Sequence, residues 1–444
     1  MRRTSVSLVL LLAVTSTAAA DDWPQWMGPQ RDGRYRESGL IEAFPEDGPK
    51  IDWSADCRQG YAGPAVAGGK VFLFDYVQSG GESFNNPSKP AEIQGTERLR
   101  ALDASTGETL WTYEYERPYT VSYPAGPRCT PTVADGRVYL LGAMGDLTCV
   151  AAEDGAKQWH VNLPEAIGCK VPIWGFASHP LVDGGLVYTM GGGAGSAVVA
   201  LKADSGEVAW KALDSKDAGY APLNIHEYGG VRQLIGWTPQ QVVSLNPESG
   251  ESYWTVDLEP NYGMSIMAPQ RAGNMLFAAG IGSKSAVIRL GEDEPTAEVV
   301  WRDAGGRSLY PGNMTPLIDE GLVYGFDIGS GLMKAVSLAD GSTTWETFEP
   351  VAPKGFTDRW RNRHATAFVT QAVAEDRFVM FNELGELIFA TLDPKGYVEQ
   401  SRAKIVEPTN EAFGRWVVWS HPAYADHAAF VRNDKKIVRV NLAK

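Results

Sequence analysis

A glycine followed four residues later by a tryptophan recurs along this chain. The frame first appears in ALDASTGETLW, which ends at Trp111. It returns in segments that end at Trp159, Trp210, Trp254 and Trp345. Glycine tolerates the positive φ of a tight hairpin, so each copy is expected to turn at the glycine and place the tryptophan on the following strand. A frame that returns at this spacing predicts a repeat architecture.

Each copy also contains three short strand patterns ahead of the glycine turn. In the second copy these are TPTV (130–133), RVYLLG (137–142) and LTCVAA (147–152), and the hairpin to Trp159 follows them. Short segments rich in Val, Leu and Tyr and bounded by Gly and Asp are typical of strands. Four antiparallel strands per copy predict one propeller blade.

The number of blades follows from a small motif on the innermost strand of each copy. The motif returns at intervals of 42 to 67 residues, at Pro64, Pro131, Pro180, Pro222, Pro269, Pro316, Gln371 and Pro422. These eight starts predict an all-β fold, an eight-bladed propeller of four-stranded antiparallel blades. Only three strand patterns follow the last start, so KIDWSAD (50–56), with Trp53, is expected to supply the missing strand and close the ring.

The repeated tryptophans are expected to pack against neighbouring blades. Burying about 200 Å² of indole at about 25 cal/mol per Å² contributes at most about 5 kcal/mol, which accounts for the residue as structure. The set comprises Trp53, Trp111, Trp159, Trp210, Trp254, Trp301 and Trp345. Blade five lengthens its turn, and blade seven has Val398 and its neighbours where a tryptophan would stand.

The first twenty residues have the pattern of a secretory signal peptide. MRRTSVSLVLLLAVTSTAAA contains two arginines, a short apolar run and a close of small residues. Such a run is too short to anchor a mature protein in a bilayer. We expect a signal peptide over 1–20, an N-terminal extension over 21–49 and a single propeller domain over 50–444. The expected location is the periplasm or the extracellular space, without a lipid anchor or a transmembrane segment.

The net charge and the cysteines limit the classes of partner, metal site and disulfide that this chain is expected to have. The chain has 54 acidic and 40 basic side chains and a net charge of −14, so nucleic acid is not an expected partner. A monomer is expected. The cysteines are Cys57, Cys129, Cys149 and Cys169. In an oxidising compartment these four cysteines could form up to two disulfides, with three possible pairings. Their spacings resemble neither a zinc site nor a redox motif.

The motif at 101–111 resembles the pyrroloquinoline quinone (PQQ)-like β-propeller repeat of quinoprotein alcohol dehydrogenases. The same repeat forms the propeller lipoprotein of the outer-membrane β-barrel assembly machinery. DWPQWMGPQRDGRY (22–35), GYAGPAVAGGKVF and WGFASHPLVDGGLVY look like a secreted, planctomycete-type branch with this repeat. The dehydrogenases carry adjacent cysteines over the quinone and a calcium site of Glu, Asn and Asp. Here no two cysteines are adjacent and no motif matches the calcium triad, so no cofactor is expected.

Loops that lead into the innermost strands converge at one mouth of the channel, the usual place for a propeller site. Aromatic residues recur in these loops: Tyr61, Tyr119, Tyr123, Trp174, Tyr220, Tyr262, Tyr310, Trp360, Trp416 and Trp419. Two interpretations stay open. The rings form a platform for a sugar, a peptide or a flat cofactor, or they plug the channel and pack between blades.

The segment FTDRWRNRHATAF (356–368) is the densest basic patch of this acidic chain. It contains Arg359, Arg361, Arg363 and His364, and equivalent loops add Arg128 and Arg415. Guanidinium groups suit a carboxylate or another anionic ligand, and ion pairing with acidic loops is the alternative.

Three histidines occupy similar phases of the repeat: His179, His364 and His421. A ring of metal ligands is geometrically conceivable there. No carboxylate accompanies them at the same phase, so we expect structural hydrogen bonds and no metal site.

No nucleophile elbow, phosphate loop or zinc-protease motif occurs, so no catalytic residue is assigned. The expected function is a secreted, non-catalytic propeller that binds a protein, a peptide or a glycan; the alternative is a PQQ-dependent oxidoreductase acting on alcohols or sugars. The predicted ligand-binding residues at the channel mouth are Trp174, Tyr220, Tyr310, Arg359, Trp360, Arg361, Arg363, His364, Arg415 and Trp419.

Overall fold

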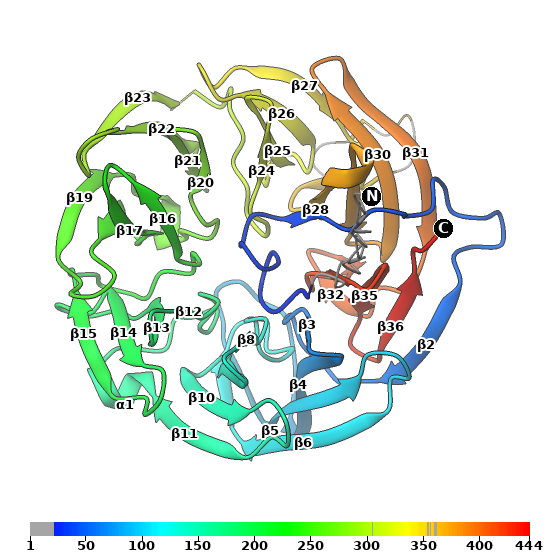
Figure 1. Cartoon of the computed structure of the whole chain (residues 1–444), viewed down its shortest axis with the longest axis horizontal. Helices are drawn as coiled ribbons and strands as arrows, with labels where there is room; N and C mark the ends of the chain where they lie inside the picture. The colour runs from blue at the N-terminus through cyan, green and yellow to red at the C-terminus, as the bar shows by residue number, and fades with distance from the viewer. Residues whose placement is uncertain (1–21, 304, 353–354, 356, 359–361) are drawn as a thin grey trace, which may run out of the picture.

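Eight four-stranded antiparallel blades surround a central channel (Figure 1). The computed structural model describes residues 22–303, 305–352, 355, 357–358 and 362–444. Helical structure is scarce: it includes α1 (Leu163–Ile167) and the 3-10 turns η1 (Asn261–Gly263) and η2 (Val373–Glu375). No helix in the described ranges has the length and apolar character needed to cross a bilayer. The predicted eight-bladed all-β propeller is confirmed.

The first four blades run in chain order from the channel outward. Their strands are β3 (Ala65–Ala67), β4 (Lys70–Gly81), β5 (Ala91–Asp103) and β6 (Thr109–Glu116); β8 (Thr132–Ala134), β9 (Arg137–Leu141), β10 (Asp146–Ala151) and β11 (Lys157–Asn162); β12 (Leu181–Asp183), β13 (Leu186–Met190), β14 (Val198–Lys202) and β15 (Val208–Ala212); β16 (Asn224–Tyr228), β17 (Val231–Trp237), β18 (Gln241–Leu245) and β19 (Ser252–Asp257). The long hairpin of blade one also pairs with β7 (Tyr119–Val121).

The next three blades repeat this order, and the eighth takes its outer strand from the other end of the chain. Their strands are β20 (Gln270–Ala272), β21 (Met275–Gly280), β22 (Lys284–Leu290) and β23 (Ala297–Asp303); β24 (Leu317–Asp319), β25 (Leu322–Phe326), β26 (Met333–Ser337) and β27 (Thr343–Thr347); β28 (Ala367–Ala372), β29 (Arg377–Asn382), β30 (Glu386–Asp393) and β31 (Gly396–Lys404); β34 (Ala423–Ala425), β35 (Ala428–Arg432), β36 (Lys436–Asn441) and β2 (Ile51–Asp56). A hairpin of β32 (Asn410–Ala412) and β33 (Arg415–Val417) precedes the last blade.

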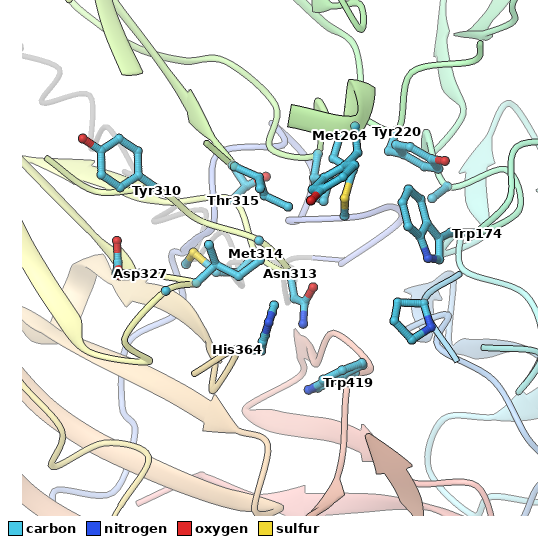
Figure 2. A pocket seen from close by; sticks show the side chains of 18 of the residues that line it. Trp174, Tyr220, Met264, Tyr310, Asn313, Met314, Thr315, Asp327, His364 and Trp419 are labelled. Atoms are coloured by element: carbon cyan, nitrogen blue, oxygen red, sulfur yellow. The ribbon is translucent and has the colours of Figure 1, made fainter. Parts of the chain in front are cut away.

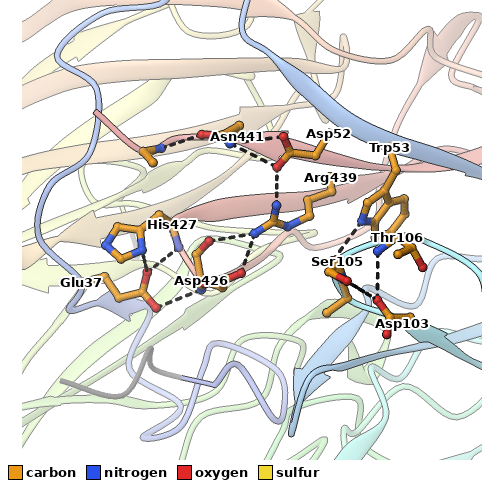
Figure 3. Close-up of polar contacts among 12 residues, drawn as sticks. Glu37, Asp52, Trp53, Asp103, Ser105, Thr106, Asp426, His427, Arg439 and Asn441 are labelled. Carbon is orange, nitrogen blue, oxygen red and sulfur yellow. Dashed lines mark hydrogen bonds and ion pairs between the residues drawn. The ribbon is translucent and has the colours of Figure 1, made fainter. Parts of the chain in front are cut away.

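The strand β2 closes the ring, as predicted, by pairing antiparallel with β36. Arg439 on β36 binds the carboxylate of Asp52 on β2 and, at 2.6 Å, that of Asp426 (Figure 3). The Glu37 carboxylate accepts the backbone N–H groups of Asp426 and His427 at 2.9 and 2.6 Å. Both ends of the chain therefore build the last blade.

The repeated tryptophans pack against the next blade, which confirms their predicted structural role. A Cβ atom on Gly206 would lie 2.7 Å from the Trp159 ring, and the φ of Gly206 is +74°. The indole N–H of Trp159 donates to the Ala203 carbonyl at 2.9 Å. The same stacking joins Trp53 to Gly107, Trp111 to Gly155, Trp210 to Gly250 and Trp301 to Gly341. The glycine thus makes the turn and also leaves room for the neighbouring indole.

The segment 22–35 lies across the channel, where Figure 1 shows it in blue. Trp23 pairs with Val66 of β3 through two backbone hydrogen bonds of 2.8 and 2.9 Å. Further along, β1 (Arg34–Tyr35) adds in parallel to β28. The Arg31 guanidinium donates to the Pro180 carbonyl at 3.0 Å and to Asn224 Oδ1 at 3.1 Å. One short segment therefore ties several innermost strands together across the channel.

The four cysteines are buried free thiols. The disulfide connectivities that the sequence leaves open are thus not used in this fold. Burial raises the pKa of the thiols of Cys57, Cys149 and Cys169 to about 11. They act as small apolar residues of the core.

Candidate functional site

A cavity of about 1190 Å³ lies among the loops that lead into the innermost strands. Figure 2 shows Trp174, Tyr220, His364 and Trp419 around the same open space. Residues directly ahead of the innermost strands contribute repeatedly to the wall: His179, Pro222, Thr315, His364 and His421. Trp26, from the segment that crosses the channel, forms the floor. The structure thus brings these loops together around one cavity, at the mouth where the sequence predicts a site.

Seven of the aromatic residues expected at the mouth line the cavity: Tyr61, Tyr123, Trp174, Tyr220, Tyr262, Tyr310 and Trp419. Two do not. Tyr119 is buried in blade one, where its hydroxyl donates to Glu97. Trp416 is 56% exposed on β33 and is not part of the lining. Trp360 lies outside the described residues.

The arginines of the predicted basic patch are only partly at the cavity. Arg359 and Arg361 lie outside the described residues, and Arg363 lines the cavity. Arg415 is not in the lining; it binds Glu383 through two N–H groups at 2.7 and 3.1 Å. Glu383 also accepts the indole N–H of Trp419 at 3.1 Å. Arg415 is therefore ion-paired with Glu383, the arrangement that the sequence left open as the alternative to ligand binding.

Arg128 lines the cavity, but its guanidinium is hydrogen-bonded to the loops around it. Its guanidinium donates to the carbonyls of Ser122, Tyr123, Gly126 and Trp174. It also lies 5.3 Å from the centre of the Tyr61 ring. Arg128 holds the aromatic loops of the first and second blades in place.

Four residues that line the cavity have a left-handed backbone conformation. The φ angles of Tyr123, Tyr262, His364 and Phe413 are 51°, 62°, 64° and 51°. Bulky residues rarely adopt this conformation, which costs of order 1–3 kcal/mol each and concentrates at functional sites. Tyr262 is also 82% exposed, and the His364 ring stacks on Phe413 at 4.0 Å. We call these four residues the aromatic rim.

The polar groups of the wall are held by hydrogen bonds. Lys334 lies 3.6 Å from the Asp327 carboxylate and donates to the Ser308 carbonyl at 3.1 Å. The Tyr310 hydroxyl donates to Asp303, and burial together with this bond raises the pKa of Tyr310 to about 12. These groups therefore present fixed donors and acceptors rather than mobile charges.

All three histidines of the predicted ring line the cavity. His179 Nδ1 accepts the backbone N–H of Thr130 at 2.9 Å, and His421 Nε2 accepts the indole N–H of Trp26 at 3.2 Å. Two of the three rings thus make structural hydrogen bonds, while the His364 ring stacks on Phe413. The described residues contain no group of three or more His, Cys, Asp or Glu side chains arranged to hold a metal ion.

Burial keeps these rings neutral near pH 7. It lowers the pKa of His421 to about 3 and, with His421 and Arg31 nearby, that of His179 well below its ordinary value. Burial and the neighbouring Arg363 and Arg415 lower the pKa of His364 to about 4. Neutral imidazole offers one N–H donor and one acceptor nitrogen.

Sequence reasoning did not assign Trp26, Phe413 and Lys334 to the site. Trp26 belongs to the aromatic opening DWPQWMGPQRDGRY, which has no counterpart in the repeats. The sequence did contain a signal for Trp26: the tryptophans that pack between blades are expected inside the Gly-x-x-x-Trp frame, and Trp26 lies outside it. Phe413 lies between β32 and β33, outside the four-stranded blades, and Lys334 is on β26, the third strand of blade six.

Comparison with known proteins agrees with this fold. The PQQ_2 family model, described as outer membrane protein assembly factor BamB, matches residues 36–166, 95–228, 196–388 and 238–435. The quinoprotein alcohol dehydrogenase PedH of Pseudomonas putida is 32% identical over 145 residues, which cover 29% of this chain and 22% of that protein. The matched stretch thus spans about a fifth of that relative.

Among the solved structures with a similar fold, two illustrate the likeness over most of the chain. BamB from Moraxella catarrhalis superposes with a TM-score of 0.55 at 12% identity and covers 88% of this chain and 99% of its own. The quinohemoprotein alcohol dehydrogenase ADHIIG from Pseudomonas putida HK5 gives 0.59 at 13% identity, with 95% and 80% covered. At these identities the likeness concerns the fold alone.

Proposed function

This chain belongs to the PQQ-like β-propeller repeat family, and from that membership we propose that it is a non-catalytic glycan-binding protein of the periplasm or the extracellular space. The aromatic rim carries the proposal. Four residues with unfavourable backbone conformations surround one cavity, and the most exposed of them, Tyr262, is 82% exposed, so burial of its ring does not account for its position. The pattern of residues 1–20 supports the proposed location.

A saccharide matches the chemistry of the cavity. Sugar rings have apolar C–H faces that stack on aromatic side chains and hydroxyl edges that need hydrogen-bond partners. Trp174 and Tyr220, with ring centres 5.8 Å apart, supply the apolar surface. Asn313 and Thr315 bring amide and hydroxyl groups to the same space (Figure 2). The volume exceeds the range of about 300–1,000 Å³ typical of small-ligand pockets, so the end of a chain of sugars fits better than one sugar.

The residues of the cavity do not fit pyrroloquinoline quinone. No cysteine is among the described residues of the lining, so the disulfide cover of the dehydrogenases has no counterpart. Asp327 is the one carboxylate described there, and it already accepts hydrogen bonds from Ser330. Arg128 is taken up by four carbonyl groups. The described lining thus offers no cysteine and a single carboxylate that is already engaged, which supports a binding role rather than quinone chemistry.

Calorimetric titration of the secreted chain with a panel of oligosaccharides tests this proposal. We expect saturable binding that Tyr262→Ala and Trp174→Ala each weaken about tenfold, because each removes a stacking surface. The control is Trp416→Ala, which removes an equally bulky exposed ring outside the cavity and leaves the affinity unchanged.

Three results would contradict the proposal. The first is that no saccharide binds. The second is that short peptides, and no sugars, bind with the same dependence on Tyr262. The third is dye-linked oxidation of alcohols or sugars after addition of the quinone and calcium.

A further inference from the structure

Two histidine rings meet at the floor of the cavity, beside Trp26. Trp26 stacks on His179 with ring centres 5.1 Å apart and planes at 16°. His421 stands edge-on to His179 at 5.7 Å and 87°. Trp26 and His179 are 2% and 5% exposed, so the rings are fixed by packing. The pair is brought together by β12, β34 and the N-terminal segment, which are distant in sequence.

The hydrogen bonds of the two rings determine where their protons lie. A backbone N–H can only donate, so His179 Nδ1 is an acceptor toward Thr130 and its proton is on Nε2. The indole N–H of Trp26 is likewise only a donor, so His421 accepts at Nε2 and carries its proton on Nδ1. The two rings therefore hold opposite tautomers.

Neither of these N–H groups has a hydrogen-bond acceptor among the residues that the structure describes. Within the described ranges, no hydrogen bond joins His179 Nε2 or His421 Nδ1 to any acceptor, although both rings line the cavity. Neither nitrogen is among the fully buried unpaired atoms of the described residues, so both N–H groups remain accessible to a ligand in the cavity. The floor thus offers two unused, pre-oriented donors to a ligand oxygen.

The charged residues around the cavity indicate whether the ligand oxygen at the floor is neutral or anionic. The charged residues described in the lining are Arg128, Lys334 and Arg363 against the single carboxylate of Asp327. The chain as a whole carries a net charge of −14. A local excess of cations in an acidic protein favours an anionic group at this place.

We infer that His179 and His421 together bind a carboxylate oxygen at the floor of the cavity, so that the glycan taken up by this protein carries an acidic sugar. The inference rests on the proposed glycan-binding function and specifies its ligand. The aromatic rim would stack the sugar rings, while the two N–H groups would receive the carboxylate of a terminal uronate.

Two substitutions remove the proposed donors and keep the internal hydrogen bonds. In His179→Asn, the amide oxygen replaces Nδ1 as acceptor for Thr130, and the Nε2–H is lost. In His421→Gln, the amide oxygen replaces Nε2 as acceptor for Trp26, and the Nδ1–H is lost. The control is His160→Gln on β11, whose ring bonds Thr148 on the outer side of blade two and not the cavity.

The experiment compares galacturonate-terminated disaccharides with galactose-terminated ones and with the uronate methyl esters. We expect the acid to bind about tenfold tighter than the neutral sugar, and each floor variant to bring the ratio of the two affinities close to one. Equal affinity of acid and neutral sugar would overturn the inference and leave glycan binding standing. Failure of all saccharides to bind would overturn both.

Nitrogen-15 NMR of histidine-labelled protein gives a readout that does not depend on the variants. The spectrum is expected to show His179 protonated at Nε2 and His421 at Nδ1, with both protonated nitrogens shifting when galacturonate is added. Unchanged shifts at saturating galacturonate would refute the contact even if the variants fail to fold.

Discussion

The glycine of each Gly-x-x-x-Trp frame is constrained twice. Its positive φ is needed for the hairpin, and its missing side chain leaves the space that the neighbouring indole occupies. Gly206 shows both constraints, while Gly136 has a φ of +72° and no atom within 4 Å of where a Cβ would lie. The two glycines therefore separate the backbone requirement from the packing requirement.

Alanine substitution at these positions measures the two contributions. Gly136→Ala should lower the free energy of unfolding by about 1–2 kcal/mol, the usual cost of a left-handed alanine. Gly206→Ala should lower it further, because the Trp159 ring would have to move away from the new methyl group. Urea denaturation provides the comparison. Equal losses in the two variants would show that the indole does not pack on the glycine.

At the scale of elements, β2 and the segment 22–35 lie close together in the sequence but have different structural roles. The segment 22–35 fills the channel and contributes Trp26 to the cavity floor. β2 covers β36, whose N–H and C=O groups would otherwise form an exposed sheet edge. Stability and ligand binding should therefore depend on different parts of the N-terminal region.

Two truncated chains separate these parts. A chain of residues 50–444 lacks the channel segment and keeps β2, while a chain of residues 58–444 lacks both. We expect the shorter chain to melt at a lower temperature or to aggregate, because an unpaired edge strand is a template for association. Both chains should lose saccharide binding, since both lack Trp26. Identical melting curves and scattering for the two would refute closure by β2.

For the whole molecule, histidine burial links folding stability to pH. Five histidines have pKa values below the ordinary value: His160, His179, His226, His364 and His421. The unfolded chain therefore binds more protons than the folded one as the pH falls below about 6.5, so stability decreases toward acid pH. Three buried carboxyls with raised pKa values, Glu97, Glu383 and Asp434, act in the opposite direction.

His226 allows the histidine contribution to be measured apart from the site. Burial, with Arg271 nearby, lowers its pKa to about 4, and it does not line the cavity. Its contribution is present above the unfolded pKa and is lost as the pH falls from about 6.5 toward 4. In His226→Asn, the loss of unfolding free energy between pH 7 and pH 5 should be smaller than in the parent. Parallel pH profiles would show that His226 titrates normally in the folded protein.

The fold could be predicted from the sequence because its determinants are local and repeated. The glycine turn, the alternation of short apolar strands and the outer tryptophan recur within each blade, and the count of inner-strand motifs sets the number of blades. The same periodicity placed Trp174, Tyr220, Tyr310, His364 and Trp419 at one mouth. Blade seven was the weakest match, since β28 begins at Ala367, ahead of the Gln371 that marked it.

Only the tertiary structure decided what the site contains. Arg31 meets Asn224 across 193 positions, and Trp26 meets His421 across 395, so no local pattern could place the N-terminal segment in the channel. The occupation of Arg128 and Arg415 by carbonyls and Glu383 likewise depends on loops from different blades. Repeats encode the scaffold through contacts that every blade shares, whereas the cavity floor is built from single contacts that occur once. Those contacts set the tautomers of His179 and His421, on which the proposed carboxylate contact depends.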